Sequence, residues 1–279
     1  MKKASLFAGI LLVMSFQSAA FLETDSGKAA LVDLSGSITP NSASGLVSSG
    51  GITPEKVRSL NERAVSQGAD AIVYQINSQG GAVVASKEIK CEIDRAEVPT
   101  VCRLRDTAAS GGYLIALGCD RIVADSATLT GSIGVTASYL EFSGLLDRLG
   151  VEYVNVSAGE FKEAGSPLRN ATPEEKALLR GKIGSVQNEF VSLVREERNM
   201  TGPDLSNATT GELIIGERAL ELGMVDSLGG RREALGQAEE MTELNLTYSE
   251  VETQDSLGLF SLLSARVLGV STPSLQARL

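Results

Sequence analysis

Histidine is absent from all 279 residues of this chain. Without an imidazole, the chain has no Ser-His-Asp triad, no Cys-His pair and no histidine ligand for a metal ion. A serine nucleophile would therefore need another general base, and lysine is the usual substitute. Positive charge is also in short supply, because 25 Lys and Arg stand against 35 Asp and Glu, a net charge of -10. This balance disfavours binding to nucleic acid, which needs clustered basic residues.

Cysteine is scarce as well. The chain has three, Cys91, Cys102 and Cys119, and their spacing is not that of a metal site. Two interpretations are open: one disulfide with a leftover thiol, which an oxidising compartment would permit, or three small apolar core residues. Each cysteine lies in an apolar stretch, and this favours the second interpretation.

Long hydrophobic runs are confined to the N-terminus. Lys2 and Lys3 precede an apolar stretch over residues 4–16, which is the pattern of an export signal. Cleavage near Ala20, after a run of small residues, would release the protein. Retention of residues 1–22 would instead anchor it in the cell membrane, because this segment is nearly long enough to span a bilayer. Both alternatives place the rest of the chain on the extracytoplasmic side.

The chain beyond the export segment predicts one α/β domain. After a linker at residues 23–28, strand-like apolar runs alternate with segments of helical spacing over residues 29–246. This alternation indicates parallel strands joined by right-handed crossovers, with helices packed outside the sheet. The expected strands are 29–34, 70–76, 99–104, 121–124, 151–156 and a strand and turn at 224–230; the expected helices are 54–66, 83–96, 108–117, a long helix after Thr172, and 217–222.

The C-terminal tail, residues 247–279, is apolar and almost uncharged over much of its length. We expect such a segment to be buried against another surface and not to be exposed to water. It predicts additional core contact, with an interprotomer helix, a membrane-surface helix and a docked self-ligand as alternatives.

Ser110 is the candidate nucleophile. It is followed by Gly111 and Gly112, which allow a sharp entry into a helix and leave open space beside the hydroxyl. A second glycine pair, Gly80 and Gly81, follows a buried strand. One N–H from each pair would form a two-donor oxyanion hole, although either pair taken alone is an ordinary turn.

Lys162 is the candidate general base, in a Gly- and Pro-bounded loop at residues 159–169. A lysine acts as a base only after losing its proton, which burial against apolar side chains promotes. Glu160 and Glu163 would oppose this loss, so we expect both to point away from the amine. Ser132 lies in a third glycine loop, from which its hydroxyl could hold the lysine amine on Ser110.

Together these segments resemble the signal peptide peptidase A (protease IV) family of Ser/Lys peptidases, in the Clp-protease/crotonase superfamily. Fifty-two positions separate Ser110 from Lys162, and the resemblance covers about residues 28–244. One departure is Gln79, where the family usually has proline. The matching pieces, in order, are NSQGG at 77–81, AASGGY at 108–113, GSIG at 131–134, GEFK at 159–162, TPEE at 172–175 and ALELGMVD at 219–226.

The resemblance implies a fold of repeated strand-strand-helix units with one catalytic domain. It implies that Ser110 is the nucleophile and Lys162 the general base, with Gly81 and Gly111 as oxyanion donors. It also implies a homo-oligomer with sites near subunit interfaces, so that a lysine can reach the serine of a neighbour. The expected substrates are extended apolar peptides, including signal peptides at the membrane, and no cofactor is required.

Two other functions remain as alternatives. The first is a crotonase-type acyl-CoA enzyme on the same scaffold, which the export signal disfavours because CoA is cytosolic. The second is a non-catalytic assembly that binds peptides or membrane partners through the apolar tail.

Overall fold

The computed structural model describes residues 25–41 and 51–252. The predicted export segment at 1–22 and most of the apolar tail lie outside these residues. Within the described ranges, no helix combines the length and the apolar character needed to cross a membrane.

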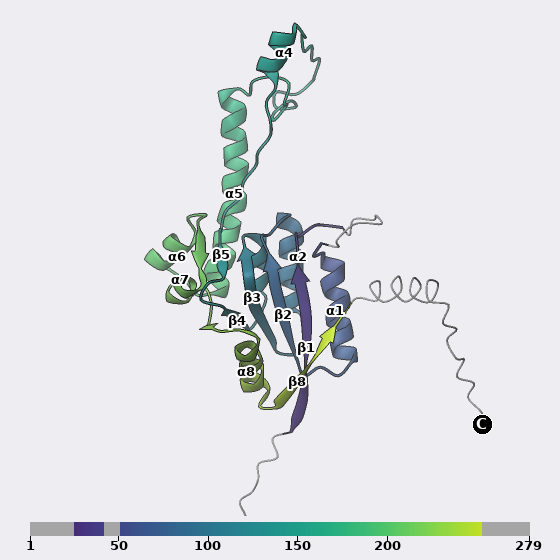
Figure 1. Cartoon of the computed structure of the whole chain (residues 1–279). Helices are drawn as coiled ribbons and strands as arrows, with labels where there is room; N and C mark the ends of the chain where they lie inside the picture. Colours follow the sequence, from purple (N-terminus) through teal and green to yellow (C-terminus); the bar gives the residue numbers. More distant parts are fainter. Residues whose placement is uncertain (1–24, 42–50, 253–279) are drawn as a thin grey trace, which may run out of the picture.

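An eight-stranded mixed sheet forms the centre of the molecule (Figure 1). Its main path runs β6-β5-β3-β2-β1-β8, while β4 pairs with β3 and β7. All pairings are parallel except that of β5 with β6. The strands are β1 (Ser26–Ser35), β2 (Ala71–Ser78), β3 (Thr100–Ala109), β4 (Arg121–Ala124), β5 (Leu129–Gly131), β6 (Leu213–Ile215), β7 (Ser227–Leu228) and β8 (Asn245–Val251).

Helices cover both faces of this sheet. On one face α1, α2 and α3 pack over the larger apolar core, and on the other α8 covers a smaller one (Figure 1). The single α/β domain with helices outside confirms the predicted fold class. The helices are α1 (Pro54–Ser66), α2 (Val83–Asp94), α3 (Gly111–Ala116), α4 (Ser143–Leu149), α5 (Pro173–Glu197), α6 (Gly202–Ala208), α7 (Gly216–Glu221) and α8 (Arg231–Thr242).

Strand β1 shows how its sequence divides between the two cores. Ala30, Val32 and Leu34 face α1 and α2, whereas Ala29 and Leu31 face α8. Because successive side chains of a strand point to opposite faces, a continuous apolar run is what a strand covered on both sides requires.

Most of the predicted elements are confirmed, but two differences matter for the site. The predicted helix 108–117 begins only at Gly111, because residues 108 and 109 extend β3 through pairing with β5. The predicted strand 151–156 is wrong: these residues form no strand, since no neighbouring strand offers its backbone a partner. At the C-terminal end, β8 carries the sheet to Val251, so the first residues of the predicted tail are part of the sheet.

The favoured interpretation of the cysteines is wrong. Cys102 on β3 forms a disulfide with Cys119, just after α3, with the two Cα atoms 5.7 Å apart. Cys91 is a free, exposed thiol on α2. The sequence could not show that the chain after α3 returns to the first residues of β3, which is what brings the two sulfurs together.

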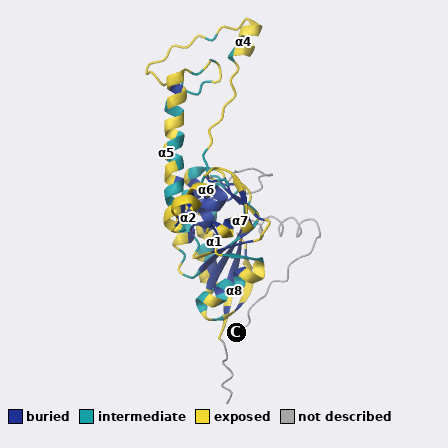
Figure 2. Ribbon diagram, turned by 90° about the vertical axis from the view of Figure 1, so that its left-hand side faces the viewer, coloured by how far each residue is buried: buried dark blue, intermediate teal, exposed yellow. Residues whose placement is uncertain are grey.

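Helix α5 rises out of the body. The chain leaves the body after β5, runs outward beside α5 to α4 and returns to the outer end of α5 (Figures 1 and 2). We call residues 135–172 the projection. The predicted long helix begins with a capping box, because Thr172 Oγ1 accepts from Glu175 N and the Glu175 carboxylate accepts from Thr172 N. The apolar stripe on α5 is buried at Phe190 and Val194 but only half-buried at its outer end. With 25 residues, the helix is roughly 37 Å long.

Removal of the disulfide should destabilise the fold. Replacing Cys102 and Cys119 together by alanine opens a loop with a sequence separation of 17 residues, and loops of this size lose about 3 kcal/mol of unfolding free energy. Urea denaturation under non-reducing conditions measures the change. Cys91→Ala is the matched control and should leave the midpoint of urea denaturation unchanged. An equal effect of the control, or no effect of the double variant, would contradict this account.

Candidate functional site

Ser110 lies in a backbone conformation that serine rarely adopts. Its φ is 53° and its ψ -121°, at the turn between β3 and α3. Both sides of the residue are held: Ser110 N donates to Gly131 O at 2.8 Å, and Ser110 O accepts from Leu114 N at 2.9 Å. A positive φ costs a non-glycine residue about 1–3 kcal/mol, so the surrounding hydrogen bonds must impose it. The side chain makes no helix-capping hydrogen bond and faces a cavity.

The two glycine pairs meet directly beside Ser110. A methyl group on Gly80 would lie 2.7 Å from Gly111 N, and one on Gly111 would lie 3.2 Å from Gly81 N. Gly111 is the first residue of α3, where an N–H has no partner inside the helix. The parallel bridge to Ile38 uses Gly80 O and Ala82 N, which leaves the N–H of Gly81 outside the bridge. The structure thus brings the two predicted oxyanion donors together next to the predicted nucleophile.

A cavity of about 690 Å³ lies in front of Ser110. Ser132 lines the same cavity, so the structure places this predicted residue near the serine. Ser132 also has a positive φ of 48°, and its N–H donates to Glu212 O at 2.7 Å. Gln79, on the loop between β2 and α2, forms another part of the wall.

Sequence reasoning missed the contribution of α5 to this cavity. Arg180, Ile183 and Gln187 line it from one side of the helix. Gln187 Nε2 donates to Ile133 O at 3.0 Å and so supports the loop that carries Ser132. The available signal was the spacing of these residues by three and four positions, which places them on one helical face.

Lys162 lies elsewhere in the single chain. It is an exposed residue in a turn of the projection and does not line the cavity at Ser110. The turn is connected to α5 near Glu175, whereas the cavity meets α5 at residues 180–187. Because a helix rises 1.5 Å per residue, eight residues from Glu175 to Ile183 span roughly 12 Å. One chain therefore brings the serine and the oxyanion donors together, but not the lysine.

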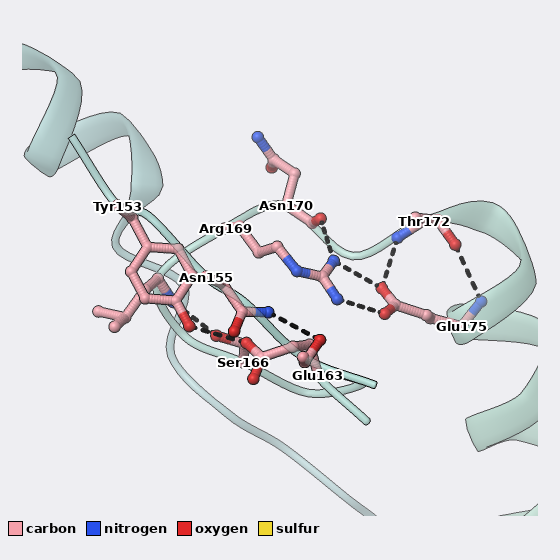
Figure 3. A network of polar contacts seen from close by, with 10 residues as sticks. Tyr153, Asn155, Glu163, Ser166, Arg169, Asn170, Thr172 and Glu175 are labelled. Atoms are coloured by element: carbon pink, nitrogen blue, oxygen red, sulfur yellow. Dashed lines mark hydrogen bonds and ion pairs between the residues drawn. The ribbon is translucent and has the colours of Figure 1, made fainter. Parts of the chain in front are cut away.

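A polar network connects the lysine turn to the start of α5 (Figure 3). The Tyr153 hydroxyl donates to Glu163 Oε2 at 2.8 Å. Arg169 binds both carboxylate oxygens of Glu175, which is almost fully buried. The hydrogen bonds from Arg169, followed by that from the Thr172 N–H, lower the pKa of Glu175 to about 2. Glu163 thus faces Tyr153.

Comparison with known proteins identifies relatives for most of the chain. The family model described as peptidase family S49 matches residues 92–245. A putative protease of Methanocaldococcus jannaschii is 30% identical over 73% of this chain and 66% of its own length. A putative signal peptide peptidase SppA of Enterococcus faecium is 36% identical over 59% of this chain and 48% of its own. The chain thus spans about half to two thirds of the length of these two curated relatives.

The fold also matches a solved structure. The 1510-N membrane-bound stomatin-specific protease, in complex with a substrate peptide, superimposes with a TM-score of 0.55. The match covers 86% of this chain and 98% of that chain at 16% sequence identity. At this identity the similarity concerns the fold.

Gly81→Ala should disrupt the loop that carries the oxyanion donors. The new methyl group would lie 2.1 Å from Ile38 O, a backbone atom that cannot rotate away. We expect a loss of about 1–3 kcal/mol from overpacking, in addition to any backbone strain. Gly68→Ala is the control, since its methyl group would meet nothing within 4 Å at a φ of +74°, and only the left-handed penalty of about 1 kcal/mol applies. Equal urea midpoints for the two variants would contradict the close approach.

Glu175 should make the lysine-bearing segment sensitive to acid. Its pKa is about 2 in the folded chain against an ordinary 4.5, so its stabilising contribution is complete above pH 4.5. That contribution is lost as the pH falls from 4.5 towards 2. The protection factors of amides in the first turn of α5, which correct for the intrinsic pH dependence of exchange, should therefore fall over this range, and Glu175→Gln should remove much of this fall. Glu62→Gln, at an exposed position on α1, is the control and should retain the pH dependence of the first turn of α5. If Glu62→Gln reduced this dependence as much as Glu175→Gln, Glu175 would not be its source.

Proposed function

Because the chain belongs to peptidase family S49, we propose that it is a serine endopeptidase with Ser110 as nucleophile and Lys162 as general base. The observation that carries this proposal is the arrangement at Ser110. Ser110 has a strained backbone, its side chain makes no helix-capping hydrogen bond, and it faces a cavity beside the N–H groups of Gly81 and Gly111. Strain at a non-glycine residue is typical of functional positions.

The proposed reaction follows from this arrangement. The neutral amine of Lys162 takes the proton of Ser110 while Oγ attacks the peptide carbonyl, and the N–H groups of Gly81 and Gly111 stabilise the oxyanion. The ammonium then returns the proton to the leaving amine, and an acyl-enzyme on Ser110 remains. Water hydrolyses this ester in the second half of the reaction, with Lys162 again as base. Ser132 would orient the amine, and its position on the wall of the same cavity supports this role.

We propose that the base reaches the nucleophile of a neighbouring subunit. The separation of Lys162 from the cavity in one chain supports this arrangement, and so does the apolar surface of the projection. Val156 is 96% exposed there and Val154 74%. Apolar patches of this kind typically mark protein–protein contacts, and a ring of identical subunits would bury them. The large apolar residues exposed in the projection are Tyr139, Leu140, Phe142, Leu145, Leu149, Val151, Val154, Val156, Phe161 and Leu168.

The proposed substrates are extended apolar peptides, including remnant signal peptides at the membrane. The cavity supports this class because Val135 and Ile183, which line it, are partly exposed apolar residues. The relatives include a putative signal peptide peptidase, and the matching solved protease was determined with a substrate peptide. The N-terminal segment would hold the enzyme at the membrane, with the catalytic domain on the extracytoplasmic side.

Alanine substitution should remove the activity without unfolding the chain. Ser110→Ala and Lys162→Ala should each lower kcat/KM for a peptide substrate by about 10⁴- to 10⁶-fold. Circular dichroism and size-exclusion chromatography check that both variants keep the fold and the assembly. A fluorophosphonate probe should label Ser110 in the wild-type protein. Full turnover by either variant would refute its assigned role.

Mixed oligomers test the arrangement between subunits. When the Ser110→Ala and Lys162→Ala variants are co-expressed, an interface that combines one intact serine with one intact lysine should restore activity. Random mixing would make roughly a quarter of the interfaces competent in this way. The two variants mixed after separate assembly are the control and should stay inactive. If co-assembled particles are also inactive, the site is completed within one chain.

A further inference from the structure

The lysine turn carries a negative charge that the structure holds in place. Glu163 directly follows Lys162, is half-buried, and accepts a hydrogen bond from the Tyr153 hydroxyl at 2.8 Å. Within the part of the chain that the structure describes, Glu163 and Lys162 form no ion pair with each other. The hydrogen bond to Glu163 raises the pKa of the Tyr153 phenol, so the phenol remains a neutral donor at neutral pH.

Arg169, a basic side chain close enough to interact with Glu163, is already occupied. Arg169 attracts Glu163 electrostatically, but both of its terminal nitrogens bind the Glu175 carboxylate (Figure 3). The turn itself is compact: Lys162 N donates to Gly159 O at 3.2 Å, and Ser166 N donates to Glu163 O at 2.9 Å. In this arrangement the Tyr153 hydroxyl is the direct hydrogen-bond donor to the Glu163 carboxylate.

We propose that Tyr153 is a positioning residue for the general base: its hydroxyl holds the Glu163 carboxylate on the segment before the turn, so that this charge does not pair with the Lys162 amine. The inference rests on the proposed function of Lys162. An amine next to a free carboxylate stays protonated to higher pH, because the opposite charge favours the ammonium form. An amine that serves as base needs the reverse. The structure meets this need by binding the carboxylate to a neutral phenol.

The charges around the turn determine the direction of the effect. Glu160 lies on the turn itself and is exposed to water, which screens it. Glu152 lies on the segment that carries Tyr153 and is also exposed, and Glu175 is neutralised by Arg169. Glu163 is therefore the carboxylate whose position the tyrosine controls. Once released from the phenol, it becomes a mobile negative charge one residue from the amine.

The pH dependence of kcat/KM for a peptide substrate tests this inference in the full-length oligomer. Tyr153→Phe should move the acidic limb of the profile upward by about half to one pH unit, because the released carboxylate stabilises the ammonium form. The plateau at high pH should stay near the wild-type value. The double variant with Tyr153→Phe and Glu163→Gln removes the charge and should return the limb to the wild-type position or below it.

Tyr139→Phe is the matched control, because Tyr139 is another partly exposed tyrosine of the projection. Its hydroxyl makes no hydrogen bond within the part of the chain that the structure describes. This variant should leave the limb in place. One contrary outcome is that Tyr153→Phe lowers the high-pH plateau of kcat/KM and that adding Glu163→Gln does not return the acidic limb to its wild-type position. Tyr153 would then have only a structural role, and the inference fails. An unshifted limb in Tyr153→Phe also overturns it. The proposed function fails separately, if Lys162→Ala keeps its activity.

Discussion

The backbone of Ser110 is held in a left-handed conformation from both sides, and the rest of the site depends on this constraint. On one side Ser110 N binds Gly131 O, and on the other Ser110 O accepts the first hydrogen bonds of α3. The helix in turn is anchored in the core, where the Tyr113 hydroxyl donates to Met224 O at 2.9 Å. The strain at one residue is thus offset by a strand, a helix and a core contact. Because the serine is fixed, the N–H of Gly111 is fixed with it.

The close approach of two loops explains why glycine is needed beside the serine. Gly81 packs against the backbone of Ile38, and Gly80 packs against the N–H of Gly111, with no room for a side chain at either position. The disulfide between Cys102 and Cys119 closes the same strand, turn and helix into one covalent loop. Backbone contacts and a covalent bond thus limit the motion of this part of the site.

The projection has the opposite character. Its apolar side chains are exposed, and residues 151–156 have no strand partner in the part of the chain that the structure describes. Its order comes from local polar contacts, among them those of Tyr153 with Glu163 and of Arg169 with Glu175. At the base of α5, Phe190 and Val194 are buried in the core, and ion pairs of Lys87 with Glu189 and of Lys90 with Glu197 join the helix to α2. A rigid body and a locally ordered projection are consistent with a site that an assembly completes.

The sequence by itself determined the chemical type of the site and the order of its elements. The absence of histidine made lysine the predicted base, the alternation of strands and helices indicated a parallel α/β sheet, and Thr172 marked the start of the long helix that is α5. These features are local, or depend on composition. The tertiary structure alone decided the pairing of Cys102 with Cys119, the contact between the two glycine loops, and the separation of Lys162 from Ser110. Each of these depends on residues that are distant in the chain, and the positions of such residues follow from packing rather than from local pattern.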